Sequence, residues 1–237
     1  MIAGHGAPVR GSDRHLEATN NKGTIKLKPI ELYTWATPNG RKVSIMLEEL
    51  ALPYNVHPIE LPKRQQHEES FLALSPNNRI PAIIDPEGPD GAPLTMFESG
   101  AILIYLAEKT GSDLLPTEAR SRAITMQWLM WQMGGVGPMF GQAHHFMFNP
   151  KEDVPYGKKR YHDETKRLYR VMKGRLDEAT YLAGDIYTVA DIATYPWVAR
   201  FPRHQVDLND YPSVKRWFDL IGERPAVEKG MAVPFLN

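Results

Sequence analysis

The chain has 237 residues, enough for one large domain or two small ones. Lys and Arg total 28 and Asp and Glu total 28, so the formal net charge is zero and no basic excess points to nucleic acid or an anionic membrane. The absence of cysteine excludes disulfides, cysteine-ligated metals and a cysteine nucleophile, so any thiol chemistry must use a thiol from another molecule. No apolar run reaches the roughly 18 residues that predict a membrane-spanning helix.

The first part of the chain alternates strand and helix patterns. Residues 1–29 are polar, have no apolar signal-peptide core, and are expected to form an N-terminal arm. From residue 30 onward, short apolar runs with turn formers between them alternate with apolar residues at helical spacing. The expected strands cover residues 30–35, 53–59, 82–84 and 94–97, and the expected helices cover residues 43–52, 65–74 and 99–110. The order β-α-β-α-β-β-α predicts a mixed sheet covered by helices, in a domain of residues 30–111.

The second part of the chain has no strand alternation. After a linker near residues 111–117, apolar residues recur three or four apart in long stretches, which predicts an all-helical domain of residues 118–230. The expected helices cover residues 118–140, 155–178, 189–200 and 214–222. Thr188 and Asp191 form a capping-box pattern, which we interpret as structural, because it begins an apolar helix.

The Thr-Pro-Asn-Gly segment at residues 37–40 separates the first strand from the first helix. Thr37 can cap this helix and Pro38 suits its first position, so an ordinary cap is one interpretation. The other is that Thr37 and Asn39 donate hydrogen bonds to a ligand thiolate. A thiol pKa of ~8.5 must fall by roughly two units, or ~2.7 kcal/mol, for the thiolate to predominate near pH 7. One hydrogen bond to a charge (~1.5–3 kcal/mol) and the helix dipole (~0.3–1 kcal/mol) suffice together.

Two further segments have both structural and functional interpretations. Pro81 opens a strand; a cis Ile80–Pro81 bond would expose the backbone of Ile80 to an extended peptide, whereas a trans bond would leave an ordinary loop. Ser99 begins an apolar helix and suits its N-cap, where free N–H groups attract carboxylates, and the adjacent Glu98 can accept from an ammonium group. This pair suits an α-amino acid head group, although a simple helix cap also explains it.

A metal site is not expected. His144 and His145 are adjacent, so they point to different sides of a helix, and no acidic residue or cysteine stands nearby at a metal-binding spacing.

The order of these segments resembles the glutathione transferase superfamily. It is carried by Thr-Pro-Asn-Gly, then Asn-Arg-Ile-Pro-Ala at residues 78–82, then Phe-Glu-Ser-Gly-Ala-Ile at residues 97–102, with the capping box and Trp197 following. Within the superfamily, Gly-Gly-Val-Gly-Pro at residues 134–138 and Gln-Ala-His-His-Phe at residues 142–146 are similar to the bacterial Nu class. The resemblance covers roughly residues 30–230 and implies a thioredoxin-like α/β domain followed by an all-α domain.

The resemblance also implies a cofactor and its contacts. One or two glutathione molecules, or glutathione disulfide, would bind each active site without a metal. Thr37 and Asn39 would face the sulfur, and Ile80, next to cis Pro81, would pair with the cysteinyl backbone. Gln66 would contact the tripeptide, and Glu98 and Ser99 would hold its γ-glutamyl end. Met133 and Gly134 would contact a second glutathione. In the homodimer that the resemblance implies, Arg160 of the partner subunit would reach a glutathione carboxylate; a solvated helix charge is the alternative for Arg160.

The implied function is that of a cytoplasmic glutathione transferase that reduces disulfides. The same thiolate also suits conjugation of electrophiles or reduction of organic hydroperoxides. A non-catalytic glutathione-binding regulator is the alternative from another class. Nucleic acid and membranes are not expected partners.

Overall fold

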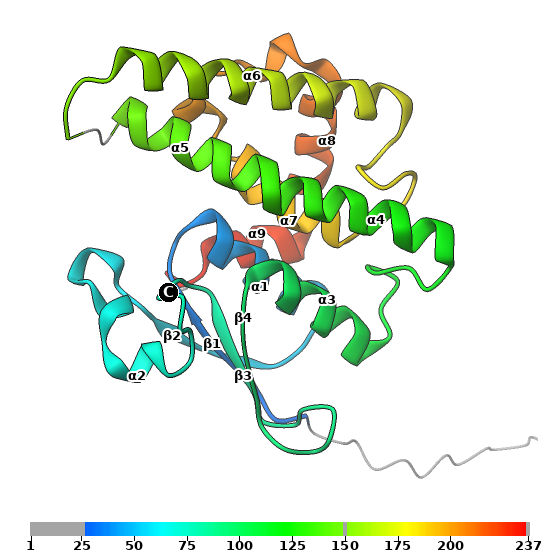
Figure 1. Cartoon of the computed structure of the whole chain (residues 1–237). Coiled ribbons are helices and arrows are strands. Elements are labelled where there is room, and N and C mark those ends of the chain that lie inside the picture. Colours follow the sequence, from blue (N-terminus) through cyan, green and yellow to red (C-terminus); the bar gives the residue numbers. More distant parts are fainter. Residues whose placement is uncertain (1–26, 149–150, 236–237) are drawn as a thin grey trace, which may run out of the picture.

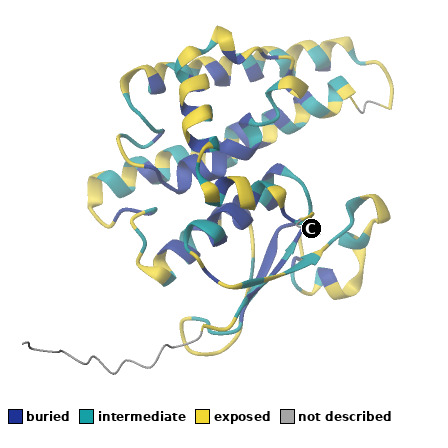
Figure 2. Cartoon of the chain, turned by 180° about the vertical axis from the view of Figure 1, so that it is seen from behind, coloured by how far each residue is buried: buried dark blue, intermediate teal, exposed yellow. Residues whose placement is uncertain are grey.

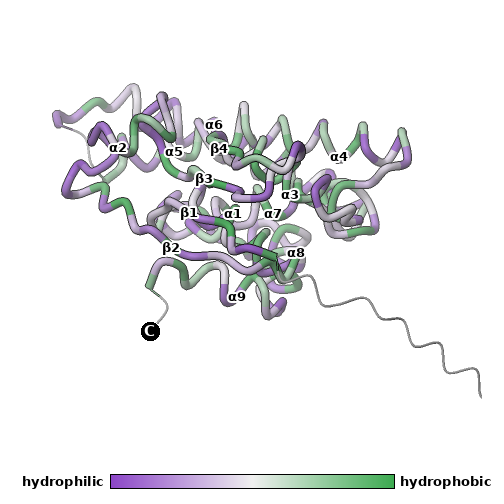
Figure 3. Tube along the Cα trace, turned by 90° about the horizontal axis from the view of Figure 1, so that it is seen from below, coloured by the Kyte–Doolittle hydropathy of each residue, from purple (hydrophilic) through white to green (hydrophobic). Residues whose placement is uncertain are grey.

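The computed structural model describes residues 27–148 and 151–235 of the chain, so most of the expected arm lies outside the described residues. A four-stranded sheet has the strand order β2-β1-β3-β4, which Figure 3 shows with the strands side by side. β1 is parallel to β2, and the other neighbouring pairs are antiparallel. The strands are β1 (Ile30–Thr34), β2 (Tyr54–Pro58), β3 (Ala82–Asp85) and β4 (Leu94–Phe97).

Helices cover both faces of this sheet (Figure 1). α1 (Pro38–Glu49) and α3 (Ser99–Thr110) lie on the face toward the helical domain, and the short α2 (Glu69–Leu72) lies on the other. Adjacent residues of β3 serve the two faces, since Ile83 belongs to the large core and Ala82 to a small core with Phe71 of α2. The sheet is mixed, as the element order predicts, and the fold is the thioredoxin-like arrangement that the family resemblance implies.

The second part of the described chain is helical. α5 and α6 run side by side on its outer side, and α7 lies between them and α1 (Figure 1). A π-helical turn at Gln132–Val136 joins α4 to α5, so these two helices form one long, locally widened rod. The helices are α4 (Ala119–Trp131), α5 (Gly137–Phe148), α6 (Pro155–Glu178), α7 (Val189–Val198), α8 (Pro212–Gly222) and α9 (Pro225–Ala232).

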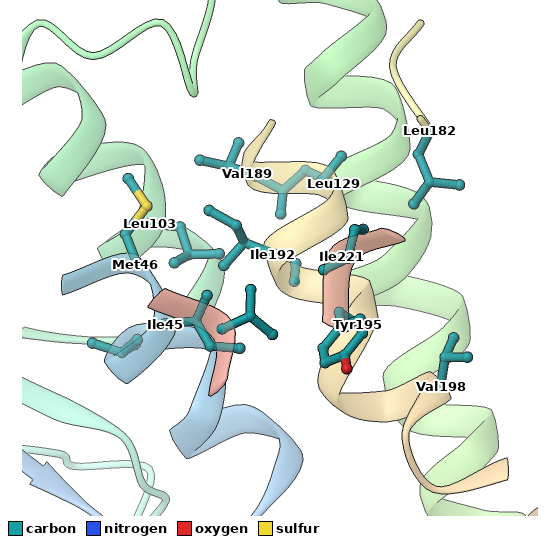
Figure 4. Packing of buried hydrophobic residues seen from close by; sticks show 14 of the residues in the cluster. Ile45, Met46, Leu103, Leu129, Leu182, Val189, Ile192, Tyr195, Val198 and Ile221 are labelled. Atoms are coloured by element: carbon teal, nitrogen blue, oxygen red, sulfur yellow. The ribbon is translucent and has the colours of Figure 1, made fainter. Parts of the chain in front are cut away.

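One continuous core joins the two parts. Ile45 and Met46 of α1 and Leu103 of α3 lie close to Ile192 of α7 (Figure 4), and buried residues gather where the sheet side meets the helical side (Figure 2). α9 lies directly on α1 at Gly230, where an added Cβ would come within 2.5 Å of the Ile45 Cα. This shared core fixes the position of the start of α1 relative to the helical domain.

The structure differs from the sequence-based expectations at three places. The helix expected over residues 65–74 is divided at Glu68, whose extended backbone (ψ 142°) separates a 3-10 turn at Gln65–His67 from α2. Only α2 is α-helical. The helix expected to end at residue 140 continues through the π-turn to Phe148. α9 was not expected, because its eight residues carry little periodicity and it depends on packing against α1.

Candidate active site

A cavity of about 520 Å³ opens between the two domains. The sheet domain forms one wall, with the residues Asn39, Lys42, Asn77, Arg79, Ile80, Pro81, Phe97, Glu98 and Ser99. The helical domain forms the other wall, with Gln132, Met133, Gly137, Pro138, Gly141, Gln142 and Trp197. A second cavity of about 200 Å³ shares Asn39, Arg79, Ile80 and Trp197 with the first and adds Thr37 and Gln66. The two cavities therefore meet at the start of α1.

The start of α1 is capped by Thr37, as the sequence predicts. The Thr37 backbone is extended, and its Oγ1 accepts a hydrogen bond from the N–H of Gly40 at 3.3 Å. Because a hydroxyl accepts and donates at once, the Thr37 O–H proton stays available to a group in the cavity. Gly40 is required here, since an added Cβ would stand 2.4 Å from both the Thr34 Oγ1 and the Trp35 carbonyl oxygen.

The orientation of the Asn39 amide is fixed from the helical domain. The indole N–H of Trp197 donates to the Asn39 Oδ1 at 3.0 Å. An indole nitrogen can only donate, so the amide oxygen must face Trp197 and the amide NH₂ is left for the cavity. Trp197 packs against the glycines of α5, since an added Cβ at Gly137 or Gly141 would be in van der Waals contact with the indole at 3.4 Å.

The loop before β3 brings a backbone edge to the same place. The Ile80–Pro81 peptide bond is cis. The side chain of Ser75 holds the loop, because its hydroxyl donates to the Arg79 carbonyl at 2.8 Å. Within the described residues, neither the backbone N–H nor the carbonyl of Ile80 has a hydrogen-bond partner. This backbone can therefore pair with an extended peptide.

The start of α3 differs in detail from the expectation. Ser99 is the first helical residue rather than the N-cap; Glu98 occupies the cap position and its side chain makes no capping hydrogen bond. Glu98 has a φ of 70°, a conformation that a non-glycine residue adopts at a cost and that recurs at functional sites. The first N–H groups of α3 are thus left without a side-chain cap at the cavity wall, where an anion can accept from them.

A buried lysine beside Ser99 was not predicted. Lys42 of α1 lines the cavity but is only 1% exposed, and its Nζ donates to the Gln132 Oε1 at 2.7 Å. Burial lowers the pKa of Lys42 to about 7, against a smaller raising effect of the Glu98 carboxylate. The sequence signal was a charged residue on the helix face that also carries Ile45 and Met46.

Most of the predicted site residues lie around the two cavities. Thr37, Asn39 and Gln66 line the smaller one, and Asn39, Ile80, Pro81, Glu98, Ser99 and Met133 line the larger. Gly134 follows Met133 in the π-turn but does not line either cavity. Arg160 lies apart on α6, in a separate surface cavity of about 730 Å³ beside Arg167 and Arg170. Within one chain, the structure does not bring Arg160 to the site.

Other lining residues were also not assigned to the site from sequence, and Arg79, Gln132 and Trp197 are the polar or aromatic ones among them that bear most on its chemistry. Arg79 adds an exposed cation within the loop motif, and Gln132 begins the π-turn with a fully buried side chain. The signal for Trp197 was its place after the capping box, but its contact with Asn39 spans 158 residues of sequence.

Some alternative chemistries find no support among the described residues. They contain no cluster of three or more His, Asp or Glu residues arranged to hold a metal ion. None of the helices described is both long and apolar enough to cross a membrane.

A thioredoxin-like sheet with a cis proline at the cavity, joined to an all-helical domain that forms the opposite wall, defines the glutathione transferase class of fold. Models of the glutathione S-transferase N-terminal and C-terminal domains match residues 32–113 and 137–225. The disulfide-bond oxidoreductase YfcG of Escherichia coli (strain K12) is 49% identical over 203 residues, covering 85% of this chain and 94% of that protein. The chain belongs to the glutathione transferase family.

Solved structures agree with this assignment. A glutathione transferase from Burkholderia graminis, with two glutathione molecules bound per subunit, has a TM-score of 0.83 and 45% identity, covering 88% of this chain and 90% of that one. A glutathione transferase from Pseudomonas putida, with one glutathione disulfide bound per subunit, has a TM-score of 0.83 and 44% identity, covering 87% of this chain and 92% of that one.

Proposed function

We propose that this protein reduces disulfides with two molecules of glutathione. The thiolate of the first attacks one sulfur of a disulfide, forms a mixed disulfide and releases one thiolate, which takes up a proton. The thiolate of the second attacks the glutathione sulfur of the mixed disulfide and releases the other thiolate. Two glutathione thiols and one disulfide become glutathione disulfide and two thiols, so electrons and protons balance.

The observation that carries this proposal is the set of donors at the start of α1. The Thr37 hydroxyl proton and the Asn39 NH₂ are both left for the cavity, because their oxygens are engaged by Gly40 and Trp197. A thiolate needs donors, and hydrogen bonds to the charged form lower a thiol pKa. Since the chain has no cysteine, the sulfur must come from the ligand. The disulfide-bond oxidoreductase name of its relative YfcG gives independent support.

The remainder of the tripeptide has matching partners along the cavity. The unpaired backbone of Ile80 suits the cysteinyl residue, as in strand addition. The exposed Glu98 carboxylate suits the γ-glutamyl ammonium, and the uncapped α3 start at Ser99 suits its carboxylate. Gln66 lines the smaller cavity, which supports a contact with the part of the ligand bound there.

We further propose a second glutathione and a homodimer. Met133 of the π-turn lines the larger cavity, where a second tripeptide would lie, and Gly134 follows it in the turn. This is in keeping with the two glutathione molecules in the Burkholderia graminis relative. Arg160 lies far from this cavity in its own chain, so in the proposal it reaches a glutathione carboxylate in the partner subunit. Membership of the Nu class and a cytoplasmic location, where glutathione is kept reduced, complete the proposal.

Replacement of Asn39 tests the function. Asn39→Ala removes a donor to the thiolate, so we expect disulfide-reductase turnover to fall about 10- to 100-fold, the value of one hydrogen bond to a charge. Turnover is measured with glutathione and 2-hydroxyethyl disulfide. Asn209→Ala, on the surface, is the control and retains wild-type turnover. Unchanged turnover in Asn39→Ala would contradict the assigned role.

A second reaction has support of its own. Phe97 is 37% exposed at the cavity, and Met133 and Pro138 add apolar surface that suits an organic electrophile or hydroperoxide. Rates with chloro-dinitrobenzene and cumene hydroperoxide, beside those with the disulfide, rank the three reactions. Glutathione binding without turnover on any of them would instead indicate a non-catalytic regulator.

A further inference from the structure

Lys42 is a buried cation that none of the preceding chemistry uses. Its Nζ lies 2.7 Å from the Gln132 Oε1, 3.3 Å from the Met133 Sδ and 3.4 Å from the Ser99 Oγ. All three partners are neutral. Among the described residues no carboxylate is within ion-pair distance of this ammonium, although a buried charge is normally paired.

The contacts of Lys42 determine which atoms of Gln132 and Ser99 can donate hydrogen bonds to the cavity. A lysine ammonium can only donate. The Gln132 amide must therefore turn its oxygen toward Lys42, which leaves its NH₂ group, whose Nε2 has no partner within the described residues. Likewise, the Ser99 oxygen accepts from Lys42, so its O–H proton must donate. In the structure it donates to the Met133 Sδ at 3.8 Å, a weak acceptor that a carboxylate can replace. Gln132 is fully buried, and Ser99 is 4% exposed.

The result is a receptor for an anion. Three kinds of donor belong to residues that line the larger cavity: the Ser99 hydroxyl, the Gln132 amide and the uncapped N–H groups at the start of α3. They come from both domains, and Lys42 adds a positive charge behind them. A carboxylate with several lone pairs fits such a group of donors.

We propose that Lys42 is a positioning residue that orients Ser99 and Gln132 as donors and supplies the counter-charge for the α-carboxylate of the γ-glutamyl group. This inference rests on the proposed function, because it assumes that glutathione is the ligand. It assigns the recognition of one ligand carboxylate to a side chain of α1 that the ligand does not need to touch.

The charge of Lys42 should respond to the ligand. Without a ligand, burial holds the pKa of Lys42 at about 7, and Glu98 is the charged group that opposes this shift. Ser99 on α3 and Gln132 and Met133 on the π-turn, its other neighbours, do not titrate. A bound carboxylate stabilises the ammonium, so binding above pH 7 adds a proton to Lys42.

The first test compares two ligands and two proteins. The ligands are glutathione and its analogue γ-aminobutyryl-cysteinyl-glycine, which lacks only the α-carboxylate. Wild type is expected to bind glutathione about 10- to 100-fold more tightly than the analogue, and Lys42→Met is expected to lose most of this preference while binding the analogue as wild type does. Lys215→Met, which removes an exposed lysine, keeps the preference.

The outcomes separate this inference from the proposed function. If wild type prefers glutathione and Lys42→Met prefers it equally, Lys42 has no such role and the proposed function stands. If wild type does not bind glutathione, both fail.

A second measurement needs no variant. Calorimetric titration of wild type at pH 8, in buffers of different ionisation enthalpy, should show more proton uptake with glutathione than with the analogue. The thiol is common to both ligands, so its proton release cancels in this difference. Equal uptake with both ligands would overturn the inference.

Discussion

Two threonine-capped helix starts in this protein differ in whether their hydrogen-bond donors have partners inside the protein. At the start of α7, Thr188 and Asp191 form a complete capping box, and the Asp191 carboxylate also accepts from the Leu182 N–H at 2.9 Å and the Trp217 indole at 2.8 Å. Both residues are fully buried. At the start of α1, Thr37 makes its capping bond, but its hydroxyl proton and the Asn39 NH₂ are left at a cavity. The local motif is similar, but the remaining donors are bonded within the protein at α7 and face a cavity at α1.

The comparison shows how to distinguish a structural cap from a binding cap. A helix start whose donors all find partners inside the protein stabilises the fold and has nothing to offer a ligand. A helix start whose donors face a cavity can bind an anion there. The motif alone does not show whether a cap is structural or binding. That depends on whether residues from other parts of the chain contact its donors or leave a cavity beside them.

The largest effect is expected from breaking the capping box at the start of α7, whose donors are all bonded within the protein. Asp191→Ala leaves the Leu182 and Thr188 N–H groups and the Trp217 indole without their acceptor, so we expect the free energy of unfolding to fall by about 3–5 kcal/mol. Urea unfolding measures this. Asp207→Ala, which removes an exposed cap of Asn209, is the matched control and should cost about 1 kcal/mol. Similar losses in the two variants would remove the distinction.

Breaking the Thr37 cap at the start of α1, whose donors face the cavity, should affect activity more than stability. Thr37→Val keeps the shape of the side chain but removes the cap and the donor, so we expect turnover with a disulfide to fall about tenfold or more and the free energy of unfolding to fall by about 1 kcal/mol. Thr37→Ser retains both functions and should behave as wild type. A stability loss in Thr37→Val with full turnover would make this start structural, like that of α7.

The contact that orients Asn39 gives a smaller effect. Trp197→Phe keeps a large ring but loses the N–H, so the Asn39 amide can flip and present its oxygen to the thiolate. We expect turnover to fall about fivefold, equivalent to about 1 kcal/mol. Trp128→Phe alters an indole outside the cavity and should not change turnover. Equal turnover in both variants would mean that Asn39 is oriented by other means.

The smallest effect concerns the ligand-free protein and pH. The pKa of Lys42 is lowered from its ordinary value of 10.5 to about 7, so the unfolded chain binds more protons between these values. Stability from this residue is therefore present above pH 10.5 and lost as the pH falls through 7. Between pH 7 and 9 we expect the free energy of unfolding to rise by about 1 kcal/mol per pH unit in wild type. The rise should be absent in Lys42→Met; parallel curves would show that Lys42 is not responsible.

Local signals predicted the parts of this molecule that depend on neighbouring residues. The strand and helix order, the cap at Thr37 and the capping box at Thr188 follow from spacing and turn residues. The resemblance to a family added the cis bond at Pro81, which spacing alone left open.

The contacts that complete the site could not be predicted in this way. Trp197 reaches Asn39 across 158 residues, and Gln132 reaches Lys42 across 90, and no local pattern encodes such distances. The position of Ser99 was predicted one residue too early relative to the helix start, because Glu98 takes a left-handed conformation that propensity does not favour. The role of Arg160 stays a prediction, since it depends on a partner subunit.

The most direct test of the account is the pKa of the glutathione thiol in the complex, followed by the ultraviolet absorbance of the thiolate as the pH is varied. We predict that wild type lowers this pKa at least about one unit below the ~8.5 of a free thiol, and that Asn39→Ala returns it most of the way. A bound thiol that titrates like free glutathione in wild type would contradict the claim that the start of α1 stabilises the thiolate.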